Sequence, residues 1–117
     1  MKYENLIVYQ KSYEAALSLY KFSETLPSDE KYGMISQLKR ASLSVPLNIA
    51  EGYGKQASDK EFFRFLTMAK GSCSEIAVLL SFMKDLGHMK EEDYQKYYER
   101  YEGIEKMLYS LMHGAKK

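Results

Sequence analysis

The residues that most often carry chemistry are scattered along this chain of 117 residues. His88 and His113 lie far apart, and neither has a second His or Cys at the spacing that a zinc site needs. A di-metal bundle would need Glu-x-x-His pairs on two helices, and the sequence contains no such pair. We therefore predict that the protein has no metal site and no bound cofactor.

Candidates for nucleophilic or acid–base catalysis are equally few. Cys73 is the only cysteine, and it falls on the apolar stripe of a predicted helix, where a thiol usually behaves as a small hydrophobic group. Glu51 and Glu75 would be the carboxylate pair of an acid–base mechanism, although salt bridges to Lys or Arg are their more usual role. We predict no catalytic residues and hence a protein that is not an enzyme.

The segment 52–55 (Gly-Tyr-Gly-Lys) is rich in glycine but lacks the spacing of a phosphate-binding loop, and no predicted strand precedes it. We predict that it links two helices. Asn48 is expected to face the core, where its amide would bond the carbonyl of Ser42, which Pro46 leaves without a donor. A functional pocket around Asn48 is the alternative reading.

Positive charge is concentrated in the middle third of the chain. The net charge is +1 overall, and it divides into −2 over residues 1–30, +4 over residues 31–70 and −1 over residues 71–117. These basic side chains could bind nucleic-acid phosphates, form the charged rim of a subunit interface, or lie solvated on the surface. The candidate phosphate contacts are Lys39, Arg40, Lys55, Lys60, Arg64 and Lys70.

Four helical segments must position these residues. Apolar residues recur at spacings of three and four, which predicts helices over about 6–24, 30–53, 59–86 and 91–112. Short links make consecutive helices antiparallel, so we predict an all-α fold, an antiparallel up-and-down four-helix bundle in one domain spanning 1–117.

Local signals mark where these helices begin, end and bend. Asn5 is the expected N-cap of the first helix, and Ser58 with Glu61 forms a capping box at the start of the third. Gly87 is the expected left-handed stop of the third helix. Pro46 lies inside the second helix, which it should bend.

Each of the first three helices shows two apolar stripes. On the first helix we assign Tyr9, Tyr13 and Tyr20 to the core, with their hydroxyls at its rim. A monomer would then leave the second stripes partly exposed, as at a subunit interface, so we expect a cyclic homo-oligomer. The candidate interface residues are Leu19, Phe22, Leu43, Leu47 and Phe82.

Composition restricts the cellular setting. Hydrophobic residues make up 45% of the chain and charged residues 28%, which is typical of globular proteins. We expect no apolar run long enough to cross a bilayer, and the N-terminus lacks the apolar core of a signal peptide. With a single cysteine, these features predict a cytoplasmic protein without a membrane partner.

The segment 44–52, Ser-Val-Pro-Leu-Asn-Ile-Ala-Glu-Gly, resembles the S-[VI]-P-x-N-I-A-E-G signature of the 23S rRNA intervening-sequence family of bacterial four-helix bundle proteins. A second family motif matches 61–66, Glu-Phe-Phe-Arg-Phe-Leu, and the opening 6–10 is similar, with Tyr9 where tryptophan is frequent. The resemblance implies a ring-like homopentamer. It also implies kinship with the accessory variability protein of diversity-generating retroelements, which works with a reverse transcriptase and its RNA.

Three classes of function remain open. The first is a non-catalytic oligomer that binds RNA, another nucleic acid or a reverse-transcriptase-like protein, as the kinship and the basic middle third indicate. The second is a protein–protein interaction scaffold with no nucleic acid role, which the near-neutral net charge favours. The third is a small hydrolase, which the lack of a catalytic constellation disfavours.

Overall fold

The computed structural model describes residues 2–27, 33–54 and 58–114. No strand occurs in these ranges, so the predicted all-α fold is confirmed. The predicted start of the second helix at residue 30 lies outside them. The elements are a short 3-10 helix η1 (Tyr3–Asn5) and the α-helices α1 (Ile7–Ser23), α2 (Met34–Gly54), α3 (Asp59–Asp85) and α4 (Glu91–Gly114).

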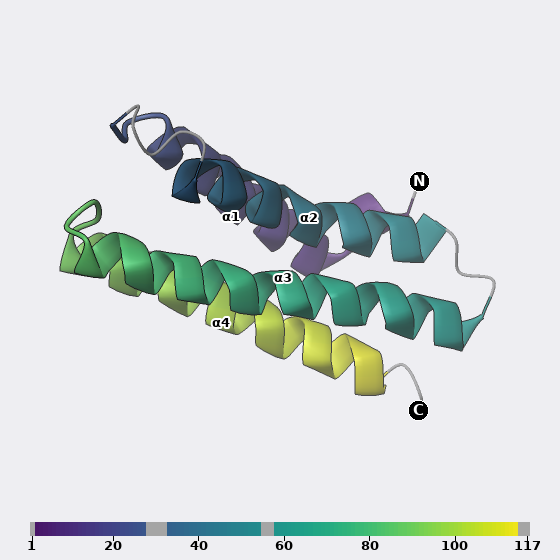
Figure 1. The fold of residues 1–117 in the computed structure, drawn as a ribbon. Coiled ribbons are helices and arrows are strands. Elements are labelled where there is room, and N and C mark those ends of the chain that lie inside the picture. The colour runs from purple at the N-terminus through teal and green to yellow at the C-terminus, as the bar shows by residue number, and fades with distance from the viewer. Residues whose placement is uncertain (1, 28–32, 55–57, 115–117) are drawn as a thin grey trace.

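The helices form two layers, α1 with α2 and α3 with α4, and consecutive helices run in opposite directions (Figure 1). The N- and C-terminal ends of the chain therefore lie at the same end of a bundle that measures 45 × 23 × 20 Å. Each helix packs on its neighbours in the chain, and α1 also packs on α4, which closes the bundle. This is the predicted up-and-down arrangement.

The core contains side chains from all four helices. Leu19 of α1, Ile49 of α2, Leu66 of α3 and Leu108 of α4 are each at most 1% exposed. Burying one such side chain stabilises the fold by about 1.5–3 kcal/mol, so the shared core is what holds the four helices together.

Helix α1 turns a different face to the core from the one we predicted. Leu19, predicted as an exposed interface residue, is 1% exposed, whereas Tyr13 and Tyr20 are 53% and 38% exposed. The buried face includes Ser12 and Ser23, whose hydroxyls donate to the carbonyls of Tyr9 and Tyr20 on their own helix. Small side chains let α1 approach the bundle closely, and this requirement outweighs the larger apolar area of the tyrosine face.

The two ends of α3 are as predicted. The hydroxyl of Ser58 accepts a hydrogen bond from the amide of Glu61 at 3.1 Å. At the other end Gly87 has a φ of +82°, and the amide of His88 donates to the carbonyl of Met83 at 2.8 Å. These are the bonds of a glycine-terminated helix, so α3 is fixed at both ends by its sequence.

Two local predictions were wrong. Asn5 ends η1, and the N-cap of α1 is Leu6, which makes no side-chain cap bond. Asn48 donates to the carbonyl of Ser44 at 2.8 Å and not to that of Ser42. The reason is helical geometry, because an i−4 carbonyl lies directly behind a side chain whereas an i−6 carbonyl faces another direction.

Gly52 is buried inside α2, within the helix predicted over about 30–53 and not in the link predicted over 52–55. A Cβ atom at this position would lie 2.6 Å from the Cβ of Phe65 on α3. Only glycine permits this approach, so Gly52 sets the distance between α2 and α3.

Helix α3 corrects our expectation about membranes, since by length and composition it could cross a bilayer. In the bundle it is a core helix, packed on α2 and α4, with Leu66, Ile76 and Leu80 fully buried. This packing accounts for the buried apolar side chains of α3.

Gly52→Ala should lower the free energy of unfolding by about 1–3 kcal/mol, because overpacking against Phe65 outweighs the gain in helix propensity. Urea denaturation measures the change. Gly103→Ala is the matched control, since a Cβ at Gly103 meets nothing within 4 Å and should stabilise α4 by up to ~1 kcal/mol. Equal effects at the two positions would contradict the close-packing role.

Candidate functional site: an aromatic groove between α1 and α2

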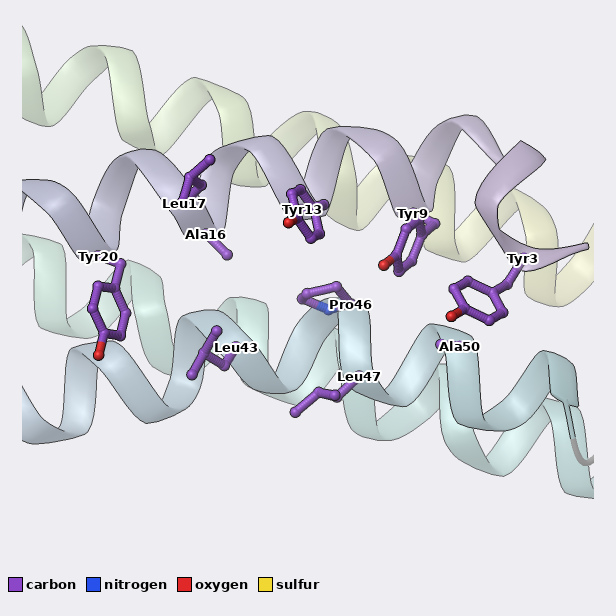
Figure 2. Close-up of a pocket in the computed structure, with 10 residues that line it drawn as sticks. All are labelled: Tyr3, Tyr9, Tyr13, Ala16, Leu17, Tyr20, Leu43, Pro46, Leu47 and Ala50. Atoms are coloured by element: carbon purple, nitrogen blue, oxygen red, sulfur yellow. The ribbon is translucent and has the colours of Figure 1, made fainter. Parts of the chain in front are cut away.

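A groove of ≈ 550 Å³ runs along the seam between α1 and α2 (Figure 2). None of its ten lining residues is charged. They are Tyr3, Tyr9, Tyr13, Ala16, Leu17, Tyr20, Leu43, Pro46, Leu47 and Ala50.

A row of tyrosine rings forms the α1 wall. Tyr9, Tyr13 and Tyr20 follow one another at helical spacing. Tyr13 and Tyr20 are exposed, whereas Tyr9 is half-buried and packs against the edge of the core. Element η1 adds Tyr3, whose ring meets that of Tyr9 edge-on with centroids 4.9 Å apart, and the rings of Tyr9 and Tyr13 are 6.0 Å apart. Tyrosine offers a rigid apolar surface with a polar tip, which suits binding to another protein.

Helix α2 supplies the aliphatic wall. Leu43 and Leu47 are 43% and 64% exposed, and they stand one turn apart beside Pro46 and Ala50 (Figure 2).

The tyrosine wall carries no charge at Tyr9. Burial raises the pKa of Tyr9, with smaller contributions from Tyr3, Tyr13 and Glu4, so this hydroxyl stays protonated. The groove is therefore neutral as well as apolar.

An ion pair lies beside Tyr20, which lines the groove. The ammonium of Lys39 lies 2.6 Å from a carboxylate oxygen of Glu24 and 4.5 Å from the centre of the Tyr20 ring. The hydrogen bond to Glu24 raises the pKa of Lys39, so the lysine stays charged and paired. The positive charge of Lys39 is therefore balanced by Glu24, and its ammonium lies over the ring of Tyr20.

A second apolar surface lies on the outer side of α3. Met68, Val78, Phe82 and Leu86 are between 40% and 56% exposed. With Gly71 and Glu75 between them they follow spacings of three and four, which places them on one side of the helix. We call these six residues the α3 stripe.

The predicted interface residues fall in four different places. Leu43 and Leu47 lie together in the groove, and Phe82 lies on the α3 stripe. Phe22 is half-buried, with its ring 6.1 Å from that of Tyr97. Leu19 belongs to the core and is withdrawn as an interface candidate.

The predicted phosphate contacts do not gather in the groove. Lys39 pairs with Glu24, Arg64 with Glu61 at 3.1 Å, and Lys70 with Glu105 at 3.9 Å. Within the described ranges, Arg40 and Lys60 are exposed and make no ion pair. Lys55 lies outside those ranges. At most two of the described candidates are thus available to phosphate without breaking an ion pair.

Residues with catalytic potential are buried or dispersed. Cys73 is 1% exposed, and burial raises the pKa of its thiol to about 12. The hydroxyl of Tyr101 is buried without a hydrogen-bond partner in the described part of the chain. In that same part, no cluster of three or more His, Cys, Asp or Glu side chains could hold a metal ion. Neither Cys73 nor Tyr101 opens onto the groove.

The groove was missed from the sequence because the α1 tyrosines were assigned to the core. A signal was present in the other stripe, where Ser12, Ala15, Leu19 and Ser23 recur with mostly small side chains. Small residues mark the face on which a helix packs closely, whereas tyrosine is common where one end of a ring stays in water.

The 44–52 motif is explained by packing and not by chemistry. Ser44 is hydrogen-bonded to Ser72 of α3, Val45 and Ile49 are completely buried, and Gly52 meets Phe65. The motif fastens α2 to α3. Leu47, at the variable position of the motif, is its most exposed apolar member and faces the groove.

Comparison with known proteins gives one family. The family model described as 23S rRNA-intervening sequence protein matches residues 4–110. Among solved structures, this chain resembles a protein with unknown function from the S23 ribosomal protein family of Bacteroides thetaiotaomicron VPI-5482, with 27% identity and a TM-score of 0.79. The match covers 92% of this chain and 99% of that one. No curated protein matches.

Cys73 should make stability depend on pH in alkaline solution. Its folded pKa of about 12 exceeds the ordinary thiol value of 9.0, so above pH 9.0 the unfolded chain loses the proton first. The free energy of unfolding should fall by up to ~1.4 kcal/mol per pH unit from this group. Urea titrations at rising pH should show a shallower decline for Cys73→Ala, and parallel declines would contradict the burial of the thiol.

Proposed function

This chain belongs to the 23S rRNA-intervening sequence protein family, and from that premise we propose that it is a non-catalytic protein that acts as a homo-oligomer. The family and the solved relative are of unknown function, so the proposal rests on the surface of the bundle. Its single strongest support is the uncharged aromatic groove between α1 and α2.

Apolar area of this kind is unusual on a protein that stays monomeric. Leu17, Leu43 and Leu47 are each more than 40% exposed within one groove, and the tyrosines extend the same surface. Patches on monomers rarely exceed a few hundred Å², and larger ones mark contacts with other proteins. We take a second copy of the same chain as the partner, because it is present wherever the first copy is.

The groove also supports a role without catalysis. Its lining offers tyrosine hydroxyls and aliphatic carbon but no carboxylate, imidazole or thiol. Cys73, the sole thiol of the chain, is enclosed in the core. A surface so composed can bind, and the tyrosine hydroxyls are the only polar side-chain groups of its described lining that could take part in proton transfer.

Nucleic acid binding, direct or through an enzyme such as a reverse transcriptase, is the second candidate. Arg40 on α2 and Lys60 on α3 support it, because both are exposed and make no ion pair within the described ranges. A ring of subunits would repeat such contacts, so that weak phosphate binding could add up. We rank it second because three other candidate cations already pair with carboxylates.

Light scattering on a sizing column tests self-association. Wild-type protein at micromolar concentration should give a mass several times the 13.6 kDa of one chain. Leu43→Asp should lower that mass, because it places a charge in an apolar contact, while helix content stays the same since Leu43 is 43% exposed. Lys96→Asp, on the exposed side of α4, should keep the wild-type mass. A wild-type monomer would refute the proposal.

Gel-shift titrations with single-stranded and structured RNA test the second candidate. If it holds, the double variant Arg40→Gln with Lys60→Gln should bind more weakly, with a salt slope smaller by ~0.7–0.9 for each phosphate that the variant no longer neutralises. The matched control is Lys96→Gln with Lys106→Gln, which removes the same charge elsewhere. If wild-type protein at tens of micromolar does not shift the RNA, the nucleic-acid candidate is rejected and self-association is the one remaining proposal.

A further inference from the structure

We infer that the α3 stripe of one copy docks in the α1–α2 groove of a second copy, so that every subunit gives one face and receives the other. The inference rests on the proposed self-association and specifies its geometry. It names the groove as the receiving surface and Met68, Val78, Phe82 and Leu86 as the inserted side chains.

The two faces cannot satisfy each other within one chain. The groove lies between α1 and α2, whereas α3 packs its buried side on α2 and α4 and turns the stripe outward. Ser44 bonds Ser72, and this contact holds the inner faces of α2 and α3 together. Leu47 and Phe82 therefore both point away from the bundle, and each needs a partner from outside.

The shapes of the two faces are complementary. The groove is a concave seam lined by side chains of α1 and α2 (Figure 2). The stripe is a ridge on a single helix, in which Val78, Phe82 and Leu86 follow one another every four residues. A ridge at that spacing is what fits between the side-chain rows of a neighbouring pair of helices, as in helix-in-groove recognition.

The chemistry and the areas also match. The groove lining is uncharged, and the stripe has Glu75 as its one charged member. The exposed parts of the large groove and stripe residues come to roughly 800 Å², if each side chain is taken to be as large as an aromatic one, about 150–250 Å². A standard interface buries ~1,600 Å², of which somewhat over half is apolar, so complete burial of both faces would supply most of the apolar area of such an interface.

A contact between two unlike faces has a consequence for assembly. After the first contact, one copy still has a free groove and the other copy still has a free stripe, so addition continues until the ring closes. In the alternative arrangement, the groove of one subunit would contact the groove of another, and the stripe of one subunit would contact the stripe of another. The two arrangements differ in what complementary single variants can do when they are mixed.

The experiment mixes two variants, Leu47→Asp in the groove and Phe82→Asp on the stripe. The wild-type side chains are 64% and 55% exposed, so both variants should keep the helix content of the wild type by circular dichroism. Alone, each should be a monomer by light scattering. Mixed in equal amounts, they should form a species of twice the monomer mass and no larger, because only one intact groove and one intact stripe can meet.

Three outcomes would overturn the inference: either variant alone keeping the wild-type mass, either variant alone forming dimers, or no heterodimer in the mixture up to ~500 µM, a concentration that populates even weak contacts. Lys96→Asp, mixed with each variant, controls for nonspecific charge effects. Wild-type protein that is itself monomeric would refute the proposed function, whereas an oligomeric wild type with one of these outcomes would refute only the docking geometry.

Discussion

The close approach of α2 to α3 at Gly52 is the constraint on which the rest of the bundle depends. A side chain at that position would collide with Phe65, and the hydrogen bond between Ser44 and Ser72 joins the same two helices farther along. These contacts commit one face of α2 to α3. Since residues on the far side of a helix cannot share that contact, Leu43 and Leu47 are left on the outside.

Close packing of the helices also explains the groove. Helix α1 packs on the bundle through small residues such as Ser12 and Ala15, so Tyr13 and Tyr20 remain exposed beside α2. Facing the aliphatic wall of α2, they form an apolar seam that the bundle has no helix left to cover. With the α3 stripe exposed as well, one chain carries two apolar faces that a second copy could bury against each other.

Much of the fold could be predicted because its signals are local. The period of apolar residues located four helices, and Ser58 and Gly87 marked the two ends of α3 through bonds within a few residues. The face that α1 turns inward could not be predicted in this way. Both of its stripes are apolar, and the choice depends on how closely other helices approach, which is a property of the packed bundle. For the same reason Gly52 was taken for a link, and Leu19 for an interface residue.

Crosslinking tests whether the α3 stripe of one copy docks in the α1–α2 groove of another. Leu47→Cys and Phe82→Cys are each placed in a Cys73→Ala background, and a short thiol crosslinker is added to each protein alone and to their mixture. A covalent species of two chains should form in the mixture, far above the amount that either protein forms alone. Crosslinks that form as readily within each single variant as in the mixture would contradict it.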